Sequence, residues 1–167
     1  NMQTASFTIM GTAPYVQARF SAKAQNKMRE KHLLGSQGKK GVAKEPRDFE
    51  ADYRGAMHIA EEGWHGIPAS AFRAAMISAC RLVGFKMTLA KMSIFVEADG
   101  IDVVDGLPLI RIEGMPERNE MHTRNETGVA DIRIRPMWRQ WSANVRFTFD
   151  ADQFSIQDVT NLIMRVG

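Results

Sequence analysis

A strictly alternating segment near the end of the sequence restricts the possible folds more than any other feature. Its members are Ser142, Ala143, Asn144, Val145, Arg146, Phe147, Thr148 and Phe149. Polar and apolar side chains alternate along it, which is the two-residue period of a strand with one buried face. After it, Ser155 and Asp158 have the spacing of a capping box that opens a helix. The two features together predict a sheet whose apolar face is covered by helices.

The preceding sequence predicts further elements in a defined order. Strands are expected over residues 5–10, 92–98, 107–113 and 129–135, and helices over residues 17–34, 48–59 and 68–83. Pro68 is expected at the first position of its helix, where a missing N–H costs nothing, and Gly84 is expected to end that helix. This order predicts an α+β fold, an antiparallel sheet with helices on one face.

Length and composition indicate a single domain. The chain has 167 residues, and no apolar run approaches the roughly 20 residues needed to cross a bilayer. The start of the sequence lacks a signal-peptide pattern. The single cysteine, Cys80, excludes an intramolecular disulfide, and its place in a helical pattern predicts a buried thiol. These features predict a cytoplasmic protein without membrane association.

The charges are distributed unevenly along the chain. Residues 1–47 hold nine Lys/Arg and two Asp/Glu, a net charge of +7, whereas residues 48–167 hold thirteen and seventeen, a net charge of −4. This asymmetry concentrates positive potential on one segment. It favours a polyanionic partner over a small substrate.

The basic residues of the first expected helix are spaced to contact successive phosphates. Arg19, Lys23 and Lys27 follow one another in four-residue steps, which places them on one helix face. Cations at this spacing can neutralise neighbouring phosphates and gain from counterion release. The aromatic residues that could stack on bases are Tyr15, Phe20, Trp64, Trp138 and Trp141.

Two further pairs of cations extend this pattern. Lys39 and Lys40 lie in the glycine-rich residues 35–46, for which the composition predicts a mobile basic loop. Arg133 and Arg135 are two residues apart in an expected strand and therefore share one face of it. Together these residues make single-stranded nucleic acid the leading candidate partner.

Metal-dependent and hydrolytic functions have little support in the sequence. His58 and His65 are seven residues apart and no cysteine pair exists, so no zinc-ligand spacing occurs. Asp99, Asp102 and Asp105 lack the spacing of a calcium loop and are expected to form a turn between strands. No nucleophile elbow, Walker loop or dinucleotide fingerprint is found, although a histidine base assembled only in space would leave no such motif. We therefore expect a protein that is not an enzyme and has no metal or cofactor.

The segment Gly66-Ile67-Pro68-Ala69-Ser70-Ala71-Phe72-Arg73-Ala74-Ala75 resembles a motif of the RAMP superfamily, the repeat-associated proteins of CRISPR effector complexes. In that family a loop reading roughly Ile-Pro-Gly-Ser-Ser enters the first helix of a ferredoxin-like domain, and a basic residue follows soon after. The strand that ends at Gly11 and the following Thr12–Tyr15 are similar to the family's first strand and turn. The resemblance covers residues 5–15 and 66–84 directly.

The resemblance implies a ferredoxin-like, modified RNA-recognition fold over residues 1–167, with a basic insertion at about residues 17–63. It also implies that Ser70 and Arg73 lie near a phosphate. Two departures stand out. Ala69 replaces the usual glycine, and the family's glycine-rich loop and final strand follow its last helix, where this sequence reaches Gly167.

The resemblance and the charge pattern lead to one functional expectation. We expect a non-catalytic, single-stranded RNA-binding protein, similar to the backbone subunit that polymerises along a guide RNA as a homo-oligomer or filament. One alternative is a phage-type structural or assembly protein that self-associates through its basic arm. Another is a single-stranded DNA-binding or annealing protein, because composition does not reveal the contacts that distinguish RNA from DNA.

Overall fold

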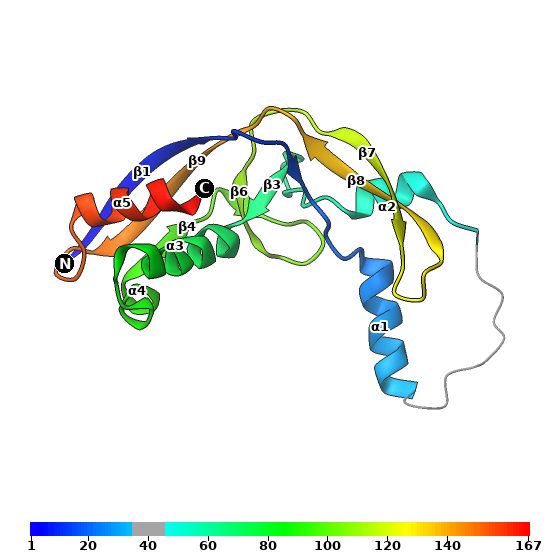
Figure 1. The fold of residues 1–167 in the computed structure, drawn as a ribbon, viewed down its shortest axis with the longest axis horizontal. Coiled ribbons are helices and arrows are strands. Elements are labelled where there is room, and N and C mark those ends of the chain that lie inside the picture. Colours follow the sequence, from blue (N-terminus) through cyan, green and yellow to red (C-terminus); the bar gives the residue numbers. More distant parts are fainter. Residues whose placement is uncertain (35–45) are drawn as a thin grey trace. The chain divides into compact units, whose positions relative to one another are not determined.

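The computed structural model describes residues 1–34 and 46–167 (Figure 1). The helices are α1 (Ala22–Leu34), α2 (Phe49–Gly55), α3 (Ala69–Val83), α4 (Met87–Ser93) and α5 (Ile156–Val166). The strands are β1 (Met2–Met10), β2 (Tyr15–Val16), β3 (Gly66–Pro68), β4 (Ile94–Glu97), β5 (Gly100–Ile101), β6 (Pro108–Arg111), β7 (Glu117–Arg124), β8 (Ala130–Trp138) and β9 (Ser142–Asp150). The strands form small antiparallel sheets, so the predicted α+β class is confirmed. None of the helices in the described ranges is both long and apolar enough to span a membrane.

The chain folds into two compact units. Unit 1 contains residues 1–11, 58–113 and 142–167, and unit 2 contains residues 12–57 and 114–141. Residues 17–57 of the basic insertion expected at about residues 17–63 contribute to unit 2 together with a second segment from later in the chain, whereas residues 58–63 belong to unit 1. The two segments are joined because β2 pairs with β8 and α2 packs against β8.

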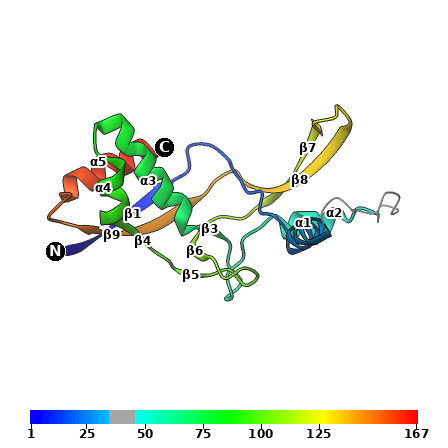
Figure 2. The ribbon, with the colours of Figure 1, turned by 90° about the horizontal axis from the view of Figure 1, so that it is seen from below.

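The main sheet of unit 1 has the strand order β1-β9-β4, with all neighbours antiparallel. The register between β1 and β9 runs without interruption from Met2↔Asp150 to Met10↔Ser142. Helices α3 and α5 pack against each other and lie on one side of this sheet (Figures 1 and 2). The predicted alternation of the last strand is confirmed, since Val145, Phe147 and Phe149 are buried while the residues between them are more exposed.

Helix α3 follows its predicted pattern except at its start. Pro68 ends β3 opposite Leu109 and precedes the helix as its N-cap, so the expectation that Pro68 is the first helical residue is wrong by one position. The pairing of β3 with β6 holds Pro68 in an extended conformation. Gly84 ends the helix in the left-handed conformation, with a φ of 77°, as predicted. Phe72 and Met76 are buried among the apolar residues of this helix.

Helices α1 and α2 are shorter than expected, and α4 was not expected. Helix α2 ends at Gly55, not at residue 59, since Ile59 forms a bridge with His65. Helix α1 begins at Ala22, not at residue 17, because the preceding backbone pairs with other segments: the N–H of Gln17 donates to the carbonyl of Pro136 at 3.1 Å. Ser21 then caps the helix, accepting from the N–H of Ala24. Helix α4 was not indicated by the sequence pattern, and it shortens the strand expected at 92–98 to β4.

The capping box before α5 is formed as predicted. The hydroxyl of Ser155 accepts from the N–H of Asp158 at 3.1 Å, and the carboxylate of Asp158 accepts from the N–H of Ser155 at 2.8 Å. Phe154 is buried directly before the cap and meets Phe85 edge to face, with the ring centroids 5.5 Å apart. These contacts fix the start of α5 on unit 1.

In unit 2, β7 and β8 form a hairpin that pairs with β2 through β8. The side chain of Asn125 closes the hairpin turn by accepting from the N–H of Thr127 and of Val129. Strand β7 was not indicated by the sequence, because its residues, ERNEMHTR, lack an apolar alternation. Tyr15 lies between Trp138 and Trp141, with 5.6 Å between ring centroids in both pairs. Because Trp138 is fully buried, this ring belongs to the core of unit 2 and is not available to stack on a base.

Cys80 gives a direct test of the packing in unit 1. The residue is fully buried, as predicted, and burial raises the pKa of its thiol. We expect the thiol to react with a disulfide reagent far more slowly in the native protein than in denaturant, because both access and thiolate formation are suppressed. The measurement is the rate of thiol modification followed by absorbance, and equal rates in the two conditions would contradict the described packing.

Candidate nucleic-acid interface

The positive charge of the chain belongs to unit 2. Counted over the sequence, unit 2 holds fifteen Lys/Arg and nine Asp/Glu, a formal net charge of +6. Unit 1 holds seven and ten, a net charge of −3, so that the two units account for the chain's +3. The tertiary grouping therefore sharpens the asymmetry seen along the sequence, and a polyanion is expected to prefer unit 2.

An open hollow of about 830 Å³ in unit 2 gathers arginines from three parts of the chain. The charged residues that line it are Arg19, Arg47, Arg133, Arg135, Asp52 and Asp131. We call it the arginine hollow. Its four guanidinium groups exceed its two carboxylates, so the lining has a formal charge of +2. Phe20, which is 66% exposed, lies in the same lining and offers an aromatic surface.

Strand geometry places Arg133 and Arg135 in the arginine hollow. The two residues alternate on β8 with Ile134, which is buried, so they project from the same face of the strand. Neither of them forms an ion pair with another residue in the described part of the chain. Arg133 helps to lower the pKa of the Asp131 carboxyl, so its charge is offset in part, while the lining as a whole keeps its formal charge of +2 for an incoming anion.

Arg47 has a different role in the same hollow. Its Nε donates to Asp52 and its Nη1 donates to Asp131, both at 2.7 Å, and its guanidinium lies over the ring of Phe49 at 5.3 Å. These contacts bridge α2 and β8. The hydrogen bond from Arg47 also lowers the pKa of the Asp131 carboxyl below its ordinary value. Arg47 therefore organises the hollow, and the sequence pattern did not single it out.

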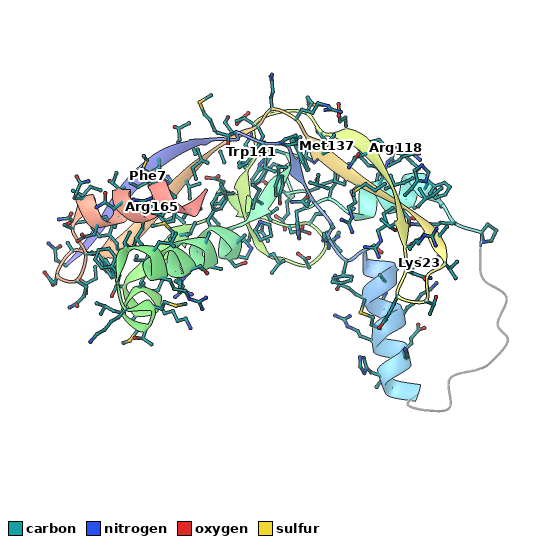
Figure 3. All side chains as sticks on the ribbon, viewed as in Figure 1. Phe7, Lys23, Arg118, Met137, Trp141 and Arg165 are labelled. Atoms are coloured by element: carbon teal, nitrogen blue, oxygen red, sulfur yellow. The ribbon has the colours of Figure 1, made fainter. Side chains whose placement is uncertain are left out.

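A second hollow of about 480 Å³ carries the basic residues of α1. Lys23 and Lys27 line it with Arg47 and Asp52, which also line the arginine hollow. Lys23 extends from the first turn of α1 (Figure 3). The five candidates Arg19, Lys23, Lys27, Arg133 and Arg135 thus all lie in unit 2 around these two hollows.

The other candidate residues lie elsewhere. Ser70 is exposed in the first turn of α3, and Arg73 follows on the same helix, both in unit 1. Nε of Arg73 donates to the carbonyl of Ile94 at 3.0 Å and Nη2 donates to the carbonyl of Lys91, while the guanidinium lies over the ring of Phe95. Arg73 therefore ties α3 to the end of α4 and to β4, a structural role that the sequence did not suggest. Lys39 and Lys40 lie outside the described residues.

One cluster in unit 1 contains groups that could ligate a metal. A nitrogen of His58 and one carboxylate oxygen each from Asp102 and Asp105 lie within 4.8 Å of one another. Nδ1 of His58 lies 2.8 Å from Asp102, whose other oxygen accepts from the N–H groups of Val104 and Asp105. The expected turn is thus present. The buried His58–Asp102 pair joins residues 44 positions apart, which is why no sequence spacing could indicate it.

Comparisons with known proteins do not assign the chain to a family. No protein-family model matches the sequence, and no curated protein matches it. We therefore infer the function from the geometry within each unit.

The bridge formed by Arg47 predicts a measurable shift in the titration of Asp131. Replacing Arg47 with Ala should raise the pKa of Asp131 toward its ordinary value, because the hydrogen-bonded cation is lost. A lowered carboxyl pKa stabilises the folded state above the ordinary pKa, and this stabilisation is lost as the pH falls through the lowered value. Carboxyl ¹³C NMR measures the shift directly. Arg54→Ala is the matched control, since Arg54 pairs with Glu50, and a pKa of Asp131 unchanged in Arg47→Ala would contradict the bridge.

Proposed function

We propose that this protein is a non-catalytic, single-stranded RNA-binding protein of the RAMP type, which grips the phosphate backbone through the arginine hollow of unit 2. The observation that carries the proposal is the gathering of four guanidinium groups in one hollow, with Arg133 and Arg135 outside any ion pair of the described residues. Guanidinium groups match phosphate geometry, and their binding releases counterions from the nucleic acid.

The topology of unit 1 supports the ferredoxin-like part of the proposal. Its elements follow the order β1, α3, β4, β9, α5, and its sheet has the order β1-β9-β4. A ferredoxin-like fold begins with the same succession, strand, helix, two strands and helix, and places its third strand between the first and the second. In this correspondence α4 and the small sheet of β3, β6 and β5 are additions.

Helix α1 supports an extended polyanionic partner. Nearly all of its described side chains are exposed, and its charged residues are Lys23, Lys27, Arg29, Glu30 and Lys31. A polar helix of this length gains little from packing and is marginal by propensity alone. Phosphates along its basic face would stabilise it. In the same proposal, exposed Ser70 approaches a phosphate at the first turn of α3, whereas Arg73 keeps its contacts with α4 and β4.

The proposal predicts the salt dependence of RNA binding. Fluorescence anisotropy with labelled single-stranded RNA and DNA of one sequence should show binding that weakens steeply with salt and is tighter for RNA. Arg133→Ala and Arg135→Ala should each weaken binding and reduce the slope of log K against log salt by about 0.7, the value for one phosphate contact on a single strand.

The control for this measurement is Arg139→Ala. Arg139 is an exposed arginine of unit 2 that pairs with Glu117 and does not line the arginine hollow, so its loss should change the slope little. Absence of RNA and DNA binding at low salt would overturn the proposal. Equal salt slopes for wild type, Arg133→Ala and Arg135→Ala would mean that the arginine hollow does not contact the phosphates. Equal affinity for RNA and DNA would favour the DNA-binding alternative.

The opposite charges of the two units favour one second candidate, a phage-type assembly protein. The basic unit 2 of one copy could bind the acidic unit 1 of the next copy head to tail. Size-exclusion chromatography before and after nuclease treatment separates the candidates. We expect any large species to collapse after nuclease, because RNA holds it together, and a species that survives nuclease would favour protein assembly.

A further inference from the structure

Unit 1 contains a hollow of about 350 Å³ whose lining differs in kind from that of the arginine hollow. The residues that line it are Trp64, Asp99, Arg111, Glu113, Asn144 and Arg146. We call it the tryptophan hollow. Its volume lies at the lower end of the range of about 300–1,000 Å³ that small-molecule pockets occupy.

Trp64 is held in place by its surroundings. Its carbonyl accepts from the N–H of Ala60 at 2.9 Å, and the turn before it contains Gly63 with a φ of 90°. Gly100 packs against the indole so closely that a Cβ at this position would lie 2.6 Å from Cζ2 of Trp64. A glycine at position 100 is therefore required to seat the ring. An aromatic ring that is fixed in advance loses little entropy when a flat ligand stacks on it.

The charges of the tryptophan hollow cancel. Two arginines face two acids, so the lining has no net charge, in contrast to the +2 of the arginine hollow. Arg111 pairs through Nε with Glu113 at 3.2 Å, and Arg146 pairs through Nε with Glu97 at 3.3 Å. A phosphate gains little in such a neutral site. A neutral ring with both donors and acceptors fits it better.

The polar groups of the lining suit the edge of a nucleobase. Asn144 is exposed on β9, and its amide offers one acceptor and two donors. Asp99 and Glu113 add carboxylate acceptors, which pair with the exocyclic amino groups of bases. Each guanidinium has five N–H groups, so Arg111 and Arg146 can donate to base carbonyls beyond their present ion pairs.

We propose that the tryptophan hollow binds one base of a single-stranded nucleic acid, stacked on Trp64 and read by Asn144, Asp99 and Glu113. The carboxylate acceptors of Asp99 and Glu113 favour bases with an exocyclic amino group, such as cytosine, over uracil, which has none. This inference rests on the proposed function for its polymeric ligand. It adds a site for base recognition to a protein whose arginine hollow recognises phosphate alone.

The first test compares oligocytidylate and oligouridylate RNA of equal length by fluorescence anisotropy. Wild type should bind oligocytidylate more tightly, and Asn144→Ala and Trp64→Ala should each reduce that preference. The affinity of Trp64→Ala for oligocytidylate should be at least about fivefold lower than that of wild type, which is the lower end of the effect of removing one stacked base. The slope with salt should stay as in wild type, because no phosphate contact is lost. Trp64→Phe keeps an aromatic ring and should retain most of the preference, which guards against a folding defect in Trp64→Ala.

Gln157→Ala provides the control for Asn144→Ala. Gln157 is an exposed amide on α5 of unit 1 and does not line the hollow, so its substitution should leave both affinities unchanged. Equal binding of the two RNAs by wild type, or an unchanged preference in Asn144→Ala and Trp64→Ala, would overturn the inference.

A second measurement separates this inference from the proposed function. Titration with cytidine and with uridine, which lack phosphate, is followed by the indole N–H resonance of Trp64 and the side-chain amide of Asn144. Larger shifts with cytidine support the tryptophan hollow even where RNA binding through unit 2 fails. Binding of RNA with a normal salt slope but equal responses to the two nucleosides overturns the hollow and leaves the proposed function standing.

Discussion

The pairing of β1 with β9 is the constraint on which the rest of the structure depends. It joins a strand from the beginning of the chain to one from near its end, over nine consecutive residue pairs. Strand β9 is central in its sheet and carries Val145, Phe147 and Phe149, which are all buried. This ladder closes a loop of nearly the whole chain. Between its two strands the chain passes through unit 2, returns to unit 1 over residues 58–113, and passes through unit 2 again before β9.

The same two chain segments supply the paired strands of unit 2. Strand β2 follows β1 and strand β8 precedes β9, and β2 pairs with β8 as β1 pairs with β9. Gly114 adds a close approach that only glycine allows: its φ is 126°, and a Cβ there would lie 2.5 Å from the carbonyl oxygen of Gln140. This connectivity brings Arg19 and Arg47 from one segment to Arg133 and Arg135 from the other.

The features that could be predicted from the sequence depend on local patterns. The alternation of β9, the capping box of α5 and the glycine that ends α3 each involve residues a few positions apart, and all three are confirmed. Strand β7 was missed because its residues do not alternate in polarity and it is defined by its pairing with β8. The start of α1 was placed too early because the backbone of residues 15–19 is used in tertiary pairing, which overrides helix propensity.

The features of the candidate site also fall into two groups, those that local sequence determines and those that depend on tertiary structure. The sequence by itself determined which residues carry the positive charge and that Arg133 and Arg135 share a strand face, because charge and strand period are local properties. Only the tertiary structure decided that Arg47 bridges Asp52 and Asp131, that Arg73 binds the carbonyls of α4 and β4, and that Trp64 sits against Gly100. These contacts join residues far apart in the chain, and their geometry is set by strand pairing and by the packing of side chains, which no local pattern encodes.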